Sequence, residues 1–304
     1  MVKLFFCSFA DEKNMKYSRL RIHKQAEEMQ VFDGGIYTYS EKDLDPDFQK
    51  HFQDKLKPEV RGFGYWVWKP HVILKTLEKM QEGDLLLYAD AGCHLNRRGR
   101  KRLLDYFEQT KNSPQGLVCF SISRSADKKI DRYDEIKHHP WLEKNWTKMD
   151  LFTYFGIDAQ NKITTQTQKV ATVIFCTKNA FCIDFIKSWL KVFYDDFSLV
   201  DDSPSKSPNF PDFIRHKHDQ SIFSLLCATR NVTSFISGSE SHSPDFKKLR
   251  DYPIHFKYDR RAKPYSLRIF FNSMKHFLSS IYPLRVTYKF FKNLFKKQTS
   301  QKIL

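Results

Sequence analysis

Asp90 is the first residue whose type and position indicate chemistry. It directly follows the apolar run at 85–89, inside the stretch GDLLLYADAGCHLN at 83–96. A carboxylate at the carboxyl end of a buried strand lies where open α/β sheets bind their ligands, and Ala91-Gly92 lets the backbone approach a bound group. The alternative is an ordinary helix cap or turn residue. We predict that Asp90 belongs to a binding site.

The segment RGFGYWVWKP at 61–70 combines two glycines, four aromatic residues and two bases. Its flat rings are suited to stacking, and its cations, Arg61 and Lys69, are suited to phosphate. It also has the features of a helix lead-in with Pro70 in the first turn, because apolar residues at 72, 74, 77 and 80 have helical spacing. Both interpretations can hold together.

Asp219 lies in RHKHDQ at 215–220, which runs into the segment 221–228. The pattern predicts a helix there and places Asp219 at its N-terminal end, either as a functional residue or as an ordinary N-cap. The pair His138-His139 is a weaker candidate for metal binding, because adjacent side chains point in different directions.

Strands and helices that follow one another are predicted to position these residues. We expect a buried strand at 2–10, a helix at 12–29 and, after Gly34-Gly35, a strand at 36–39. A strand followed by a helix is typical of the start of a doubly wound sheet. We also expect buried strands at 85–89, 117–121 and 170–176, helices at 71–80, 97–112 and 180–194, and a short strand ending near His255.

Three finer expectations concern single segments. The uninterrupted apolar run at 85–89 predicts a strand that is buried on both faces in a parallel sheet. The helix at 97–112 is expected to turn Leu103, Leu104 and Phe107 toward the core. The segment 123–150 is mostly polar and has no clear period, so we expect a long excursion over the sheet that carries substrate contacts.

The composition indicates a folded protein with an unusual distribution of charge. Its 304 residues suffice for one or two domains, and sparse Gly and Pro exclude a fibrous or low-complexity protein. The net charge is +16, but residues 260–304 contain eleven Lys or Arg and no Asp or Glu. Residues 1–259 hold 40 basic and 35 acidic side chains, so the excess charge is concentrated in the tail.

The cysteines and the apolar runs bear on the compartment. Six cysteines lie at 7, 93, 119, 176, 182 and 227, without CxxC spacing and in several cases within apolar runs. We expect reduced core residues, which favours a reducing compartment. The apolar run at the N-terminus is too short for a signal peptide, and no run approaches the roughly 18–20 residues of a membrane span. The expected location is the cytoplasm.

The order of these features resembles the GT-A class of glycosyltransferases. The similarity is most specific to a bacterial family that has a GYWxWKP segment ahead of a strand ending in YxDAG, found here as GYWVWKP at 64–70 and YADAG at 88–92. HDQS at 218–221 also matches that family's pattern. The resemblance covers residues 1–264 and implies an α/β, GT-A-like (Rossmann-like) domain with a mixed sheet flanked by helices.

A nucleoside-diphosphate sugar as donor is implied by this resemblance, together with a divalent cation, Mn²⁺ or Mg²⁺, at its diphosphate. The usual Asp-x-Asp motif would hold the cation, but the residue two positions after Asp90 is Gly92. Asp90 is then expected to bind the metal with the diphosphate and waters, and His255 is the candidate that completes the coordination.

Asp90 and Asp219 are the candidates for catalytic roles. Transfer requires the charge of the leaving diphosphate to be neutralised by a metal or by Lys and Arg. An inverting mechanism also requires a carboxylate base for the acceptor hydroxyl, and Asp219 is the candidate for that base or for an acceptor contact. The candidates for donor binding are Ser8, Phe9 and Tyr65 or Trp68 at the nucleoside, Gln166 or Gln168 at the sugar hydroxyls, and Arg19, Lys69 and Lys263 at the diphosphate.

Residues 265–304 are predicted to form two amphipathic helices, before and after Pro283, each with an apolar aromatic side opposite a basic side. Such helices lie in anionic membrane interfaces, so we predict peripheral association with the inner face of the cytoplasmic membrane. One alternative is a helical hairpin that packs on the body. A nucleic-acid surface is less favoured, because the body lacks a base-reading module.

We therefore expect a membrane-associated glycosyltransferase that uses a nucleotide sugar to extend a lipid-linked, lipopolysaccharide or capsule glycan. One alternative is a sugar-phosphate nucleotidyltransferase, which would normally show a Gly-rich phosphate loop near the first strand, where this sequence reads FCSFADEK. The other is a non-catalytic basic protein that binds membrane or nucleic acid, for which Asp90 would be dispensable.

Overall fold

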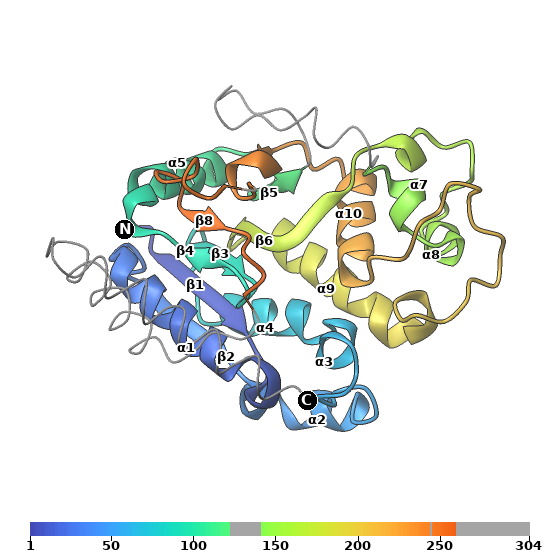
Figure 1. The fold of residues 1–304 in the computed structure, drawn as a ribbon, viewed down its shortest axis with the longest axis horizontal. Coiled ribbons are helices and arrows are strands. Elements are labelled where there is room, and N and C mark those ends of the chain that lie inside the picture. The colour runs from blue at the N-terminus through green and yellow to red at the C-terminus, as the bar shows by residue number, and fades with distance from the viewer. Residues whose placement is uncertain (122–140, 244, 260–304) are drawn as a thin grey trace, which may run out of the picture. The chain divides into compact units, whose positions relative to one another are not determined.

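The computed structural model of the chain describes residues 1–121, 141–243 and 245–259, and these contain a six-stranded sheet (Figure 1). The strands lie in the order β2-β1-β3-β6-β5-β7. Their bounds are β1 Leu4–Phe9, β2 Gly35–Tyr39, β3 Leu85–Ala89, β5 Leu117–Ser121, β6 Lys169–Thr177 and β7 Phe235–Ser237. A separate two-stranded sheet pairs β4, His94–Leu95, with β8, Ile254–His255.

Helices connect most of these strands. Their bounds are α1 Glu12–Met29, α2 Pro46–His51, α3 Gly62–Tyr65, α4 Trp68–Leu77, α5 Arg100–Lys111, α7 Glu143–Trp146, α8 Met149–Tyr154, α9 Ala180–Asp195 and α10 Asp219–Thr229. Asp11 caps α1 by accepting a hydrogen bond from the backbone nitrogen of Asn14, 2.7 Å away. The predicted helix at 12–29 and the predicted strand at 117–121 agree with α1 and β5.

The sheet is mixed in direction. β1 runs parallel to β2 and β3, whereas β6 runs antiparallel to both β3 and β5, and β5 runs parallel to β7. This confirms the predicted α/β class with a mixed sheet flanked by helices. The expectation of a parallel environment for β3 is correct on its β1 side and wrong on its β6 side. An apolar run indicates that both faces are buried, but it carries no information about the direction of the neighbouring strand.

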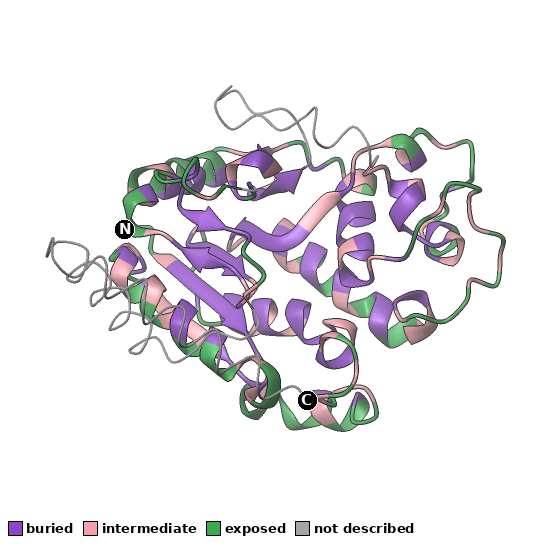
Figure 2. Ribbon diagram, viewed as in Figure 1, coloured by how far each residue is buried: buried purple, intermediate pink, exposed green. Residues whose placement is uncertain are grey.

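Alternate residues of β3 pack on opposite faces of the sheet, and all of them are buried (Figure 2). Leu86 and Tyr88 belong to the core cluster that α4, α9 and α10 cover, whereas Leu85 and Leu87 belong to the cluster under α1 and α5.

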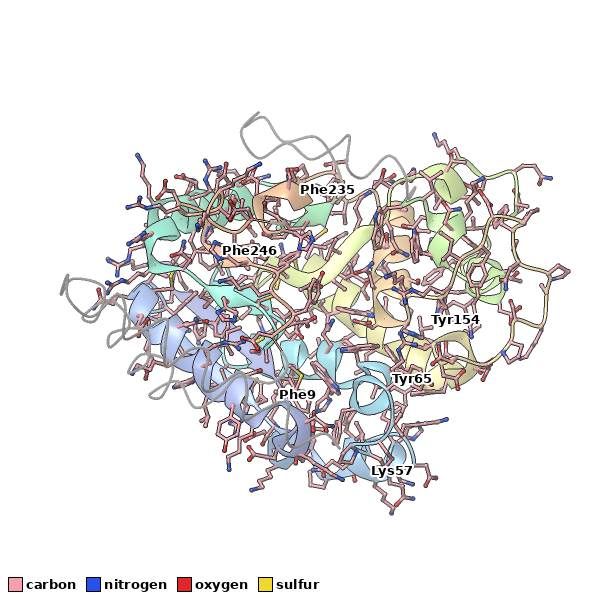
Figure 3. The ribbon with its side chains drawn as sticks, in the orientation of Figure 1. Phe9, Lys57, Tyr65, Tyr154, Phe235 and Phe246 are labelled. Atoms are coloured by element: carbon pink, nitrogen blue, oxygen red, sulfur yellow. The ribbon has the colours of Figure 1, made fainter. Side chains whose placement is uncertain are left out.

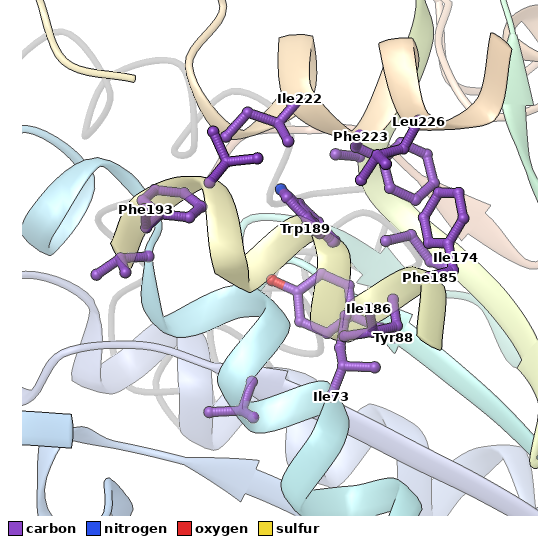
Figure 4. Close-up of a cluster of buried hydrophobic side chains, with 14 of the residues drawn as sticks. Ile73, Tyr88, Ile174, Phe185, Ile186, Trp189, Phe193, Ile222, Phe223 and Leu226 are labelled. Carbon is purple, nitrogen blue, oxygen red and sulfur yellow. The ribbon is translucent and has the colours of Figure 1, made fainter. Parts of the chain in front are cut away.

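The larger cluster lies between β3, β6 and three helices (Figure 4). Trp189 and Phe185 of α9 pack against Phe223 of α10, with ring centroids 5.1 and 5.5 Å apart. Burying each such side chain contributes about 1.5–3 kcal/mol. The cluster also includes Tyr88, so it fixes the end of β3 relative to the helices α9 and α10.

One residue of the predicted inner stripe in α5 lies on the outside. Leu103 and Phe107 are buried as expected, but Leu104 is 44% exposed. The remaining inward positions are filled by Tyr106 and Thr110. Leu104 is one residue beyond Leu103, which turns it by about 100° around a helix with 3.6 residues per turn. The expectation for Leu104 was therefore wrong.

The six cysteines are all buried and none forms a disulfide, which confirms their interpretation as reduced core residues. Burial raises the pKa of Cys7 to about 12, so this thiol stays protonated at neutral pH.

Several predicted features lie outside the described residues. They are the tail at 265–304, Lys263, and most of the polar segment 123–150, including His138-His139. The boundary between 264 and 265 and the membrane association of the tail therefore stay predictions. None of the helices that the structure describes has the length and apolar character that crossing a membrane requires.

Candidate active site

Lys69, Asp90 and Asp219 form a charged cluster where three elements meet. Lys69 lies in the first turn of α4, Asp90 follows β3, and Asp219 is the first residue of α10. The Lys69 Nζ lies 2.7 Å from Asp219 Oδ2 and 3.2 Å from Asp90 Oδ1, and it donates to the Ala171 carbonyl at 3.2 Å. The Tyr88 hydroxyl donates to Asp90 Oδ1 at 2.6 Å. One ammonium group thus connects two carboxylates that are distant in the sequence.

Burial and charge act against each other in this cluster. The side chains of Lys69 and Asp219 are 3% and 6% exposed, whereas that of Asp90 is 26% exposed. Burial opposes the charged form of Lys69, but the carboxylates of Asp219 and Asp90 outweigh it and raise the Lys69 pKa. Burial raises the pKa of Asp219 to about 6, although Lys69 acts in the opposite direction. Asp219 and Asp90 therefore share the positive charge of one buried lysine.

The segment before Lys69, which includes the short element α3, forms a left-handed turn rather than a regular helix. Five consecutive residues from Gly62 to Trp66 have positive φ angles of 60, 54, 90, 50 and 63°. Glycine adopts such angles freely, but Phe63, Tyr65 and Trp66 are in a conformation that costs an L-residue about 1–2 kcal/mol. The Trp68 indole Nε1 donates to the Gly62 carbonyl at 2.9 Å and so closes the turn onto α4. Strain of this kind is concentrated at functional sites.

A cavity of about 1030 Å³ opens above the charged cluster. It is lined by residues from the ends of β1 and β3, from the left-handed turn, from β6 and from the segment before α10. Five of the predicted site residues line it, namely Phe9, Trp68, Lys69, Asp90 and Asp219. Phe9 and Trp68 stack with ring centroids 4.1 Å apart and an interplanar angle of 22°, which makes an aromatic pair beside the cluster.

Three other predicted donor contacts are not among the cavity-lining residues. Ser8 is fully buried in β1, and its Oγ has no hydrogen-bond partner. Arg19 forms an ion pair with Glu12 and donates to the Thr38 carbonyl. Tyr65 lies apart from Phe9 (Figure 3), and its hydroxyl donates to a carboxylate of the loop after α9.

Gln168 and His255 also have partners elsewhere. The Gln168 Nε2 lies 3.3 Å from Glu143 Oε2, inside a buried polar network, and its Oε1 accepts from the Gln220 side chain at 2.7 Å. Gln220 itself lines the cavity, so Gln168 contacts the site indirectly. The His255 Nε2 lies 2.8 Å from the Leu249 carbonyl.

Sequence reasoning missed a second group of charges on the cavity wall. This cationic wall consists of Arg215 and Lys217, packed on Trp141 and Trp146. The two indoles stack at 4.5 Å, and the Lys217 Nζ lies 4.7 Å from the centroid of Trp141 and 4.5 Å from that of Trp146. Arg215, Lys217 and Trp141 all line the cavity. The basic run RHKH at 215–218 is the available signal in the sequence, but the pattern there indicates only where the following helix begins.

Arg21 is a further missed residue, and it holds the turn after β3. Its Nη2 donates to the carbonyls of Ala91 and Cys93 at 2.6 and 3.0 Å, and its Nη1 pairs with Asp259 at 3.3 Å. The chain near Asp259 covers the same turn, since a Cβ on Gly92 would lie 3.4 Å from the Cα of Tyr258. An arginine in a polar helix gave no sequence signal for this role.

Comparisons with known proteins give similarity of fold only. No family model and no curated protein matches the chain. Similar solved structures include a glycosyltransferase involved in the glycosylation of the major capsid of PBCV-1, with 11% identity over 83% of this chain and 92% of that chain and a TM-score of 0.43. Mouse xyloside xylosyltransferase 1 has 8% identity over 86% and 99%, with a TM-score of 0.44. The galactosyltransferase LgtC, solved with donor and acceptor sugar analogues, has 10% identity over 83% and 86%, with a TM-score of 0.40.

The described residues do not provide a set of free ligands for the divalent cation that the resemblance implies. One oxygen each of Asp90 and Asp219 contacts Lys69, and the position of a second acid is Gly92. His255 is engaged by a backbone carbonyl. Within the described ranges, no three His, Cys, Asp or Glu side chains gather as a metal site requires.

Proposed function

We propose that the chain is a glycosyltransferase that moves a sugar from a nucleoside-diphosphate sugar to a glycan acceptor. The observation that carries the proposal is the Lys69–Asp90–Asp219 cluster at the base of a cavity of about 1030 Å³. Ligand pockets usually measure about 300–1,000 Å³, so this cavity has room for a donor and part of an acceptor. It lies at the carboxyl ends of the parallel strands β1 and β3, where α/β sheets bind ligands.

The aromatic pair Phe9–Trp68 is the proposed place of the nucleoside. It lies at the end of β1 and lines the cavity together with Asp11 and Asn14 from the start of α1. Flat rings supply apolar contact to a base, and the polar groups beside them are suited to hydroxyls of a ribose. The sugar then extends toward Asp90, the most exposed member of the charged cluster.

Asp219 is the proposed base of an inverting transfer. Its pKa of about 6 lies close to neutral pH, which is the condition for an effective general base. The acceptor hydroxyl gives its proton to Asp219 while its oxygen forms a bond to the anomeric carbon. The bond between that carbon and the diphosphate breaks, and the diphosphate leaves with the electron pair. Lys69 keeps the Asp219 carboxylate in place through their 2.7 Å contact.

Thermal stabilisation by a panel of nucleotide sugars, each with and without Mn²⁺, tests this proposal directly. We expect one donor to raise the melting temperature and to be transferred or slowly hydrolysed. Asp90→Ala should lose nearly all turnover, whereas Asp105→Ala, which removes an exposed carboxylate of α5, should keep it. If no nucleotide sugar shifted the melting temperature, the proposed function would be abandoned.

The acceptor class follows from the predicted tail. We propose a lipid-linked, lipopolysaccharide or capsule glycan at an anionic membrane surface, and we propose that residues 265–304 bind that surface. The support is the sequence pattern of the tail, in which basic residues alternate with aromatic apolar ones and no acid occurs. A transferase held at the membrane meets a lipid-linked acceptor at high local concentration.

A further inference from the structure

We infer that the cationic wall, Lys217 and Arg215 on Trp141 and Trp146, binds the diphosphate of the donor and neutralises it as it leaves, without a divalent cation. This inference rests on the proposed function, because it assigns the leaving group of the same reaction to named residues. It starts from the charges of the site. The donor's diphosphate is an anion, and it must bind next to two carboxylates that share one lysine.

The base of the cavity is poorly suited to a diphosphate by itself. Lys69 forms ion pairs with both Asp90 and Asp219, so these two carboxylates already neutralise its charge. A nucleoside diphosphate brings at least two negative charges, which two adjacent carboxylates repel. Positive charge must therefore come from another part of the cavity, and among the described residues it is found on the wall that leads into α10.

The cationic wall carries charge that no described carboxylate pairs with. Arg61, which also lines the cavity, forms an ion pair with Asp202 at 3.4 Å, but the contacts of Lys217 and Arg215 are with indole rings. Burial, with the charges of Arg215 and Arg61, lowers the Lys217 pKa to about 8. A half-buried ammonium in such a place gains more from an anion than a solvated lysine does.

The backbone holds the Lys217 side chain against the rings. The Lys217 amide donates to the Trp146 carbonyl at 3.0 Å and to the Ser221 hydroxyl at 3.2 Å. The wall comes from α7, from Trp141 just ahead of it and from the segment before α10, whereas the aromatic pair Phe9–Trp68 comes from β1 and α4 (Figure 1). The nucleoside of the donor then lies at the aromatic pair and its diphosphate at the cationic wall, and both groups of residues line the same cavity. When the bond to the sugar breaks, the electron pair goes to a phosphate oxygen, and the two cations stabilise the new charge.

The test measures binding of inorganic pyrophosphate and of a nucleoside diphosphate to the full chain by calorimetry in the presence of EDTA. We expect both to bind and to compete with each other. Lys217→Met should raise both dissociation constants about tenfold, as the loss of a hydrogen bond to a charged group does. Lys187→Met removes an exposed lysine of α9 and is the matched control, expected to bind like the parent.

A titration of pH separates a charge effect from a structural one. Affinity of the parent for pyrophosphate should fall as the pH rises past about 8, where Lys217 loses its proton. Lys217→Arg should remove that fall, because a guanidinium stays charged. A variant that has merely lost its packing would show a lower melting temperature and no change in the pH profile.

The outcomes distinguish this inference from the proposed function. If nucleoside diphosphate binds only with Mn²⁺ and Lys217→Met does not change its dissociation constant, the inference fails but the proposed transferase function does not. Simultaneous binding of pyrophosphate and nucleoside diphosphate would assign the wall to a phosphate on the acceptor, and would also overturn the inference. If pyrophosphate binds through Lys217 but no nucleotide sugar is used, the proposed function fails and the anion site remains.

Discussion

The Lys69 side chain makes three polar contacts in a buried position, where a charged group costs free energy. Removing charged groups from water costs several kcal/mol each, and a buried ion pair often stabilises a fold no more than apolar residues of the same volume. Lys69 is 3% exposed and contacts Asp90, Asp219 and the Ala171 carbonyl. Stability alone does not account for this arrangement, whereas the proposed reaction does, because it requires two carboxylates in fixed positions.

Glu143 is a second buried carboxyl, and it should make stability depend on pH. It accepts a hydrogen bond from Ser224 and lies near Gln168 and Thr147. Burial raises its pKa from 4.5 to about 7. The folded chain therefore holds a proton that the unfolded chain has lost, and the stability present below pH 4.5 is lost as the pH rises through about 7.

Glu143→Gln removes this titration. Relative to the parent, the variant should gain on the order of 3 kcal/mol in free energy of unfolding between acid and neutral pH, because one pKa unit corresponds to about 1.4 kcal/mol. Urea unfolding at several pH values measures the difference. Glu108→Gln, at an exposed position of α5, should show no such trend. A constant difference between parent and Glu143→Gln from pH 4 to pH 8 would contradict the raised pKa.

At the scale of single elements, the sequence predicted where most helices and strands lie along the chain. It did not predict the direction of β6 or the backbone conformation of the turn before α4. The ends of α1 and β5 follow from a cap, a proline and apolar spacing. The antiparallel direction of β6 does not, because strand direction depends on partners that lie far away in the sequence. The glycines at 62 and 64 indicate a turn in the sequence. The left-handed turn also requires positive φ angles at Phe63, Tyr65 and Trp66, which no local preference of these residues favours.

Gly62→Ala tests the left-handed turn. The new Cβ would keep the unfavourable φ of 60° and would lie 2.5 Å from a ring carbon of Trp66, so the indole must move. We expect a loss of about 2–4 kcal/mol in free energy of unfolding, from backbone strain plus overpacking. Gly83→Ala is the matched control, since φ is 86° and no atom lies within 4 Å of its Cβ. Equal losses in the two variants, measured by urea unfolding, would contradict the close contact with Trp66.

At the scale of the whole chain, the sequence indicated which residues the structure brings together better than it indicated how they contact one another. Asp90, Lys69 and Asp219 were each chosen for a local reason, and the structure brings them within hydrogen-bond distance or close to it. Their pairing could not be predicted, because it depends on the packing of α4, β3 and α10. His255 was implied by the resemblance and Arg19 by its charge, and neither argument determines which way a side chain points.

The concentration of positive charge beyond residue 260 leads to a prediction for the full chain. Removing residues 265–304 should release the protein from anionic vesicles at moderate salt, because each Lys or Arg near such a surface contributes about 1 kcal/mol. Vesicle co-sedimentation measures the bound fraction, and vesicles of neutral lipid are the control. An unchanged bound fraction after truncation would show that the tail is not the membrane contact.

The contact between Lys69 and Asp219 joins residues 150 positions apart. Chains emerge from the ribosome N-terminal end first, and contacts that close long loops form late because loop closure costs entropy. A nascent chain that ends after α4 and β3 therefore contains Lys69 and Asp90 but not yet Asp219 of α10. The charged cluster therefore stays incomplete until α10 has been synthesised, and under the proposed function a chain that stops before α10 would lack its base.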